Sequence, residues 1–60
     1  MRVRAAQVED LVPEDRIIVL GQTLTVVFVA DKGGLREIYT REKTTPIIRV
    51  GSGLVYVEER

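Results

Sequence analysis

The side chains that could do chemistry in this 60-residue chain are few and restricted in type. There is no cysteine and no histidine, which excludes thiolate and imidazole chemistry, both as catalysis and as metal ligation. Ser52 lies between two glycines with no recognisable base nearby in the sequence, a setting typical of a turn residue. What remains for chemistry is an acidic cluster near the N-terminus and a basic stretch in the second half.

The acidic cluster consists of Glu9, Asp10, Glu14 and Asp15. Carboxylate oxygens suit hard cations, but this spacing matches no calcium loop and lacks the glycine at which such a loop turns. A solvated acidic turn is the better interpretation. Gly33-Gly34 is also no phosphate-binding loop, because it lacks the Lys-Ser/Thr and the helix that would follow. The sequence therefore predicts no enzyme, no metal site and no cofactor.

The basic stretch runs from residue 32 to residue 49 and holds five basic side chains against two acidic ones. If this stretch bound nucleic acid, its basic side chains would contact phosphates and the ring of Tyr39 would stack on a base. Charged loops and edge strands also arise simply to keep a sheet soluble and unpaired. Nucleic-acid binding is therefore kept as the alternative function; its candidate residues are Arg36, Tyr39, Arg41, Lys43 and Arg49.

The elements that must position these residues are short strands, because turn signals recur at short intervals. We expect strands at residues 2–8, 16–20, 23–30, 35–41, 47–50 and 54–58, and hairpin turns at residues 20–23, 31–34 and 51–53. Five to six short antiparallel strands in so small a chain are most economically curled into one barrel. The sequence thus predicts an all-β fold, a small SH3-like barrel that forms a single domain over residues 1–60.

The segment LTVVFVA, residues 24–30, is apolar on both faces of its expected strand. With Val26 and Phe28 pointing inward, its opposite face should form an exposed apolar patch with the neighbouring strand. The predicted interface is Thr25, Val27, Val29, Ile18 and Leu20, with Ile17 and Val19 as the alternative to the last two. We expect an identical copy to cover this patch across a two-fold axis, as a homodimer. The first strand, the Leu11-Val12 segment or the C-terminal strand could cover it instead.

Alternation also predicts a core, with the opposite face of an individual strand as the alternative. The expected interior residues are Val3, Ile17, Val19, Val26, Phe28, Ile38, Ile48, Val55 and Val57. Phe28 is the only phenylalanine and lies in mid-strand, so its truncation to alanine should cost about 3–5 kcal/mol.

The run Leu11-Val12-Pro13-Glu14-Asp15-Arg16-Ile17-Ile18-Val19, followed by Gly21, resembles the L-x-P-G-D-R-I-x-V segment of many small SH3-like barrels. Residues 48–57 resemble the closing hairpin of such proteins. The whole chain is similar to short SH3-like proteins of actinobacteria and their phages, although Glu14 stands where they usually carry glycine. A second resemblance is to the swapped-hairpin barrel of AbrB-like transcription factors, whose upstream segment is basic, whereas residues 7–10 here are acidic. Neither resemblance implies a catalytic residue.

The sequence predicts a non-enzymatic β-barrel interaction module that binds a protein partner and self-associates as a homodimer. The resemblance implies a bacterial accessory protein or a viral protein, which would act in the host cytoplasm. Nine basic and nine acidic residues give no net charge, so the field of the whole molecule favours no class of partner. No apolar run is long enough to cross a bilayer and no signal peptide is recognisable, so we expect a cytoplasmic protein without a membrane partner.

Overall fold

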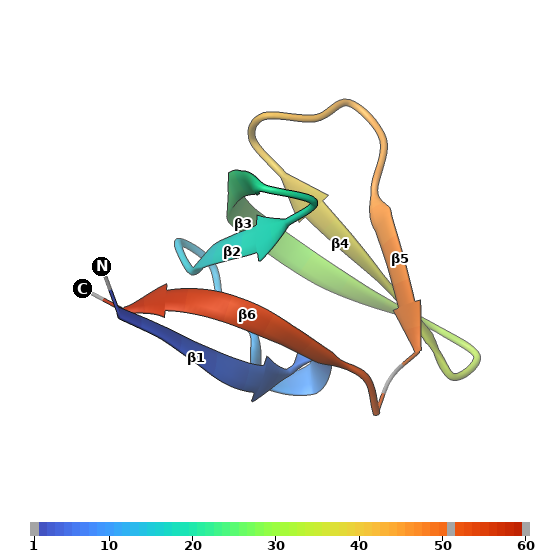
Figure 1. Ribbon diagram of the computed structural model, residues 1–60. Coiled ribbons are helices and arrows are strands. Elements are labelled where there is room, and N and C mark those ends of the chain that lie inside the picture. The colour runs from blue at the N-terminus through green and yellow to red at the C-terminus, as the bar shows by residue number, and fades with distance from the viewer. Residues whose placement is uncertain (1, 51, 60) are drawn as a thin grey trace.

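Six antiparallel strands account for most of the chain, as seen in a computed structural model that describes residues 2–50 and 52–59 (Figure 1). The elements are β1 (Arg2–Gln7), the 3-10 helix η1 (Val8–Asp10), β2 (Arg16–Val19), β3 (Gln22–Lys32), β4 (Leu35–Thr40), β5 (Ile47–Val50) and β6 (Leu54–Glu59). The strands form one sheet in the order β1-β6-β2-β3-β4-β5. The predicted all-β fold is confirmed. No helix in the described part of the chain is long and apolar enough to cross a membrane.

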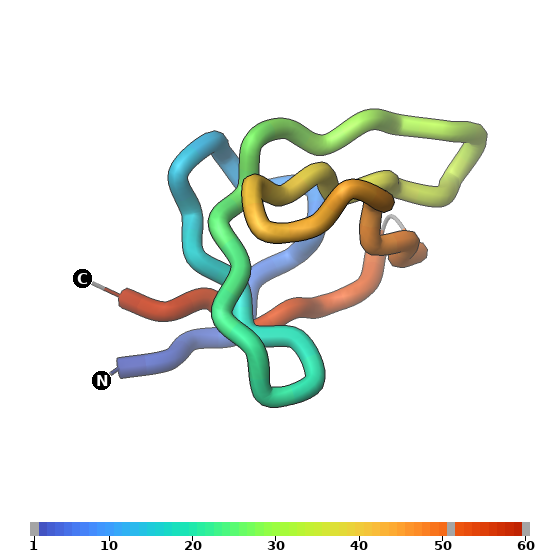
Figure 2. Tube along the Cα trace, turned by 90° about the horizontal axis from the view of Figure 1, so that it is seen from above, coloured from blue at the N-terminus to red at the C-terminus, as the bar shows by residue number. Residues whose placement is uncertain are grey.

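The longest strand, β3, belongs to both halves of the sheet. Its first part pairs with β2 and its second part with β4, and the register shifts between Val26 and Phe28. A β-bulge of this kind bends its strand and increases the local twist. The bend lets β1-β6-β2-β3 and β3-β4-β5 curl around a common interior in a barrel-like arrangement, and Figure 2 shows β3 passing from one half to the other.

Two of the three predicted hairpin turns are confirmed. Leu20-Gly21 joins β2 to β3 with φ of 49° and 77°, and Gly33-Gly34 joins β3 to β4 with φ of 59° and 90°. Two-residue turns with positive φ at both positions match the right-handed twist of the strands they connect.

The third predicted hairpin is wrong, because β5 and β6 are not neighbours in the sheet. The N–H of Gly53 donates to the carbonyl of Val50 at 2.8 Å and closes a turn, while Gly51 lies outside the described residues. From this turn the chain crosses to the other half of the sheet, where β6 lies between β1 and β2 (Figure 1).

The core contains five of the nine predicted residues: Ile17, Val26, Ile38, Val55 and Val57. Val19 is partly buried and packs against them. The remaining buried apolar residues are Ala6, Val8, Leu11, Leu24 and Ile47. Val8 and Leu11 come from η1 and the residue after it, so Leu11 of the Leu11-Val12 segment belongs to the core. Val12 itself stays exposed.

Val3, Phe28 and Ile48 were predicted to be core and are about half exposed. In β1 and β5 the reason is register. Val3 pairs with Glu58, whereas Ala6 pairs with buried Val55; likewise Ile47, not Ile48, pairs with buried Ile38.

In β3 the reason is the bulge. Val26 and Val29 both face the interior, so the two residues between them, Val27 and Phe28, are both left on the surface. The predicted cost of about 3–5 kcal/mol for truncating Phe28 assumed a buried ring and is too high for a half-exposed one.

Candidate interaction surface

The outer side of β3, β4 and β5 carries a continuous group of apolar side chains. Residues that are partners in antiparallel strands project to the same side of the sheet. Three such rows form this surface, which we call the outer face: Phe28–Tyr39, Ala30–Glu37–Ile48 and Lys32–Leu35–Val50. The exposed fraction is 50% for Phe28, 46% for Leu35, 45% for Ile48 and 59% for Val50. Leu35, Ile48 and Val50 are direct neighbours, and Phe28 is joined to them through Ala30 and Tyr39.

The aromatic pair of the outer face is fixed in place. The rings of Phe28 and Tyr39 are stacked, with centroids 4.4 Å apart and planes 16° from parallel. The hydroxyl of Tyr39 donates to Oε1 of Glu37 at 3.0 Å. This hydrogen bond raises the pKa of Tyr39, because ionising the phenol would both lose the donated proton and place two negative charges together. The arrangement holds one carboxylate beside the aromatic stack.

The five residues predicted from the sequence as an interface do not form one surface. Val29 packs against the core because the bulge has turned it inward. Ile18 and Thr25 lie on the outer side of β2 and the first part of β3, Val27 lies at the bulge, and Leu20 projects from the turn with 98% of its surface exposed. Of the predicted patch on β3, Val27 is exposed, whereas the outer face described above extends from β3 to β4 and β5.

Sequence reasoning missed Leu35, Ile48 and Val50 as surface residues and assigned Phe28 to the core. Alternation within residues 47–50 could have placed Ile48 and Val50 on a common side, but only pairing with β4 decides that this side is outside.

Thr25 is engaged in contacts of its own. Its N–H donates to Oε1 of Glu42 at 2.7 Å, and its hydroxyl donates to Oε2 at 2.9 Å. The pKa of Glu42 is lowered, chiefly by the hydrogen bond from the backbone of Thr25. These bonds attach the loop of residues 41–46 to β3, so Thr25 helps to position a loop.

The basic residues of the alternative nucleic-acid site are dispersed. Arg36 and Arg49 are cross-strand partners on the inner side of β4 and β5. Arg36 forms an ion pair with Asp31 at 3.8 Å, and Arg49 donates to the carbonyl of Ile48 at 2.8 Å. Nε of Arg36 is buried without a hydrogen-bond partner among the described residues.

The other members of that site lie elsewhere. Arg41 pairs with Glu14, Lys43 lies in the loop of residues 41–46, and Tyr39 is on the outer face. The structure does not bring the five residues together.

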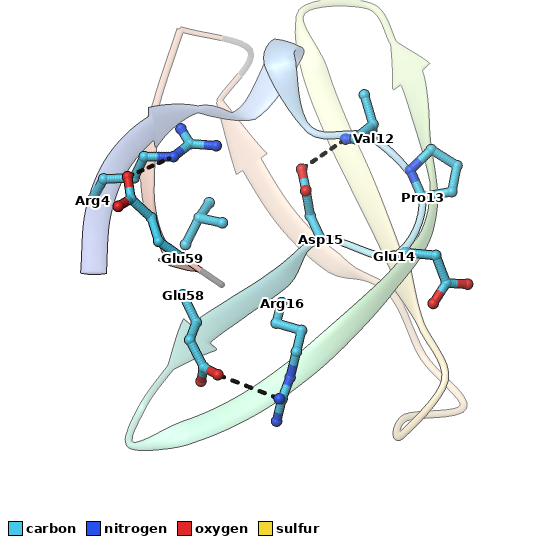
Figure 3. A pocket seen from close by; sticks show the side chains of 9 residues that line it. Arg4, Val12, Pro13, Glu14, Asp15, Arg16, Glu58 and Glu59 are labelled. Carbon is cyan, nitrogen blue, oxygen red and sulfur yellow. Dashed lines mark hydrogen bonds and ion pairs between the residues drawn. The ribbon is translucent and has the colours of Figure 1, made fainter. Parts of the chain in front are cut away.

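A shallow cleft of about 370 Å³ lies where the loop before β2 meets β6 (Figure 3). Its lining is mainly charged: Arg4, Val12, Pro13, Glu14, Asp15, Arg16, Val57, Glu58 and Glu59. Arg4 pairs with Glu59 and Arg16 with Glu58, each at 3.3 Å. Oδ2 of Asp15 accepts from the N–H of Val12 at 3.0 Å. These charges therefore neutralise one another or close a turn.

The predicted acidic cluster is divided by the fold. Glu9 and Asp10 belong to η1, while Glu14 and Asp15 belong to the following turn. No group of three or more carboxylates able to hold a metal ion occurs within residues 2–50 and 52–59.

The turn at Pro13-Glu14 is closed by a hydrogen bond from the N–H of Asp15 to the carbonyl of Val12 at 3.1 Å. Glu14 has a φ of 78°, a value that a type II turn requires at its third position and that glycine adopts most easily. Glu14 thus occupies a backbone conformation that glycine usually adopts. Two further backbone bonds, of 2.9 Å and 2.8 Å, join Glu14 and Asp15 to Val26.

Comparison of the chain with models of protein families, with curated proteins and with solved structures found no match.

Proposed function

We propose that this chain is a non-enzymatic interaction module that binds a protein partner through the outer face of β3, β4 and β5. The observation that carries the proposal is the cluster of four large apolar residues, Phe28, Leu35, Ile48 and Val50, each about half exposed on adjacent strands. A continuous apolar surface of this kind usually marks a contact site, because leaving it in water costs free energy that a partner recovers.

The chemistry of the outer face favours protein over nucleic acid. Its carboxylate, Glu37, lies beside the aromatic stack and would repel a phosphate backbone. Tyr39 already stacks on Phe28, so one face of its ring is occupied. Aromatic side chains with few surrounding charges are typical of the centre of a protein interface.

A binding role also agrees with the catalytic side chains that the sequence offers. Without histidine or cysteine, acid–base chemistry would fall to carboxylates, lysines or tyrosines. In the cleft of Figure 3, Glu58 and Glu59 are engaged by arginines and Asp15 by the backbone. The resemblance of residues 11–19 to SH3-like barrels adds support, since it implies no catalytic residue.

The proposal is tested by chemical crosslinking in cells that produce the protein, followed by capture of the tagged chain, so that complexes of weak affinity are retained; a co-expressed copy of the chain carries a second tag. Wild type is compared with Leu35→Glu and with Ile48→Glu, after circular dichroism has verified that each variant is folded. Leu20→Glu is the matched control, because it places the same charge at an exposed apolar residue away from the outer face.

We expect wild type and Leu20→Glu to retain at least one protein that both outer-face variants lose. The second copy of the chain counts as such a protein. Retention by all four baits, or loss only with Leu20→Glu, would place the contact elsewhere. Failure of wild type to retain any protein would overturn the proposal as a whole.

A further inference from the structure

The outer face carries one charge of each sign, in adjacent rows. Glu37 lies between Ala30 and Ile48, and Lys32 ends the next row beside Leu35. None of the ion pairs formed within residues 2–50 and 52–59 involves either charge. An apolar surface with an unneutralised acid and an unneutralised base on it is suited to a partner with the same two charges in reversed order.

A two-fold axis reverses that order. Consider an axis between the two packed faces that runs perpendicular to the strands and midway between the two rows. Lys32 of each copy then lies over the row that contains Glu37 in the other copy, and it is displaced from Glu37 by one strand spacing of about 4.8 Å. The flexible side chain of lysine spans such a displacement. The same operation sets Val50 over Ile48 of the other copy. An isologous interface must be self-complementary, and the outer face meets this requirement in the charges of Lys32 and Glu37 and in the contact of Val50 with Ile48, while Leu35 lies opposite Glu37 of the other copy.

The size of the surface is sufficient for a weak dimer. If all the exposed surface of its eight side chains were covered, the outer face would bury on the order of 600 Å² per copy, which places the dimer near the lower limit of specific interfaces, about 1,200 Å² in total. A chain of 60 residues buries a small core and gains stability from association.

We propose that the partner bound by the outer face is a second copy of this chain, packed face to face across a two-fold axis, with Lys32 of each copy paired to Glu37 of the other. This inference rests on the proposed function and specifies its partner. The predicted homodimer is thereby retained as a proposal, with β3, β4 and β5 as its interface in place of the five residues expected from the sequence.

Analytical ultracentrifugation of the purified full chain tests this proposal over concentrations from about 10 µM to 1 mM. We expect a reversible monomer–dimer equilibrium with Kd on the order of 100 µM, as suits an interface of this size. Ile48→Glu should leave a folded monomer. Lys32→Glu and Glu37→Lys should each weaken the dimer about tenfold by placing like charges together. The combined variant Lys32→Glu/Glu37→Lys should return Kd to within about threefold of wild type, since it restores opposite charges.

Lys43→Glu is the control, because it reverses a lysine in the loop of residues 41–46 and should leave Kd unchanged. A wild-type chain that stays monomeric at 1 mM would overturn the inference, and so would a combined variant that remains as weak as the single ones. If the chain is monomeric but still captures a different protein through the outer face, the proposed function stands and only its partner is wrong. If it is monomeric and captures nothing, both proposals fail.

Discussion

At the scale of single residues, two non-glycine residues within the described part of the chain have a backbone conformation that L-amino acids disfavour. Glu14 and Leu20 both have positive φ, which costs a residue with a Cβ roughly 1–2 kcal/mol. Glu14 compensates through its pair with Arg41 and through the backbone bonds that join its turn to β3. Leu20 is almost fully exposed, so little packing within the chain offsets its strain.

Replacing Leu20 with asparagine should therefore stabilise the protein. Asn-Gly is the preferred pair for a two-residue turn with both φ positive, and we expect a gain of about 0.5–1 kcal/mol. In a domain of this size that corresponds to a rise in Tm of roughly 3–8 °C, measured by circular dichroism. Leu54→Asn, the same change at an exposed position within β6, should not raise Tm. An unchanged or lower Tm for Leu20→Asn would show that the leucine contributes a contact of its own.

At the scale of elements, β3 connects the two halves of the sheet, because it pairs with both β2 and β4. Its bulge allows one strand to serve both halves of the sheet and exchanges the roles of its apolar residues, with Val29 inside and Phe28 outside. The largest side chain of the strand thus contributes to the surface, while the core is filled by smaller branched residues.

This exchange predicts that Phe28 matters less for stability than Ile38. Phe28→Ala loses a half-exposed ring and one stacking contact, which should cost about 1–2 kcal/mol. Ile38→Ala empties a fully buried site and should cost about 2–5 kcal/mol, a large share of the stability of so small a domain. Urea unfolding monitored by circular dichroism, below the concentration at which the chain associates, measures both. Equal losses would contradict the outward placement of Phe28.

At the scale of the whole molecule, charge is balanced, and part of it is paired within the chain. The chain has no net charge, and ion pairs occur on both halves of the sheet. The basic residues of the second half are dispersed, with Arg36 and Arg49 on the inner side of β4 and β5 and Lys43 in a loop.

We therefore expect no micromolar binding to single-stranded or duplex DNA or RNA at about 50 mM salt, measured by fluorescence anisotropy. The reason is that these cations do not follow a common path along which a phosphate backbone could lie. Micromolar affinity that falls steeply between about 50 and 200 mM salt, and that is weakened by Arg36→Gln and Arg49→Gln together, would contradict this prediction and restore the alternative function.

The turns and the approximate positions of the strands depend on neighbours along the chain and could be predicted from the amino-acid sequence. Gly21 and Gly33-Gly34 adopt positive φ because two-residue turns require it, and alternation between turns produced strands close to those observed. The residue inventory likewise restricted the available chemistry before any contact was known.

The side of each strand that faces the interior, and the order of the strands in the sheet, depend on contacts between segments far apart in the sequence. Sequence alternation has a period of two in either orientation, so an apolar residue at Ile47 or Ile48 fits equally well until pairing with Ile38 selects one of them. The bulge at residues 26–28 and the insertion of β6 between β1 and β2 depend on partners far away in sequence. The outer face exists because these non-local pairings turned Phe28, Leu35, Ile48 and Val50 to the same side.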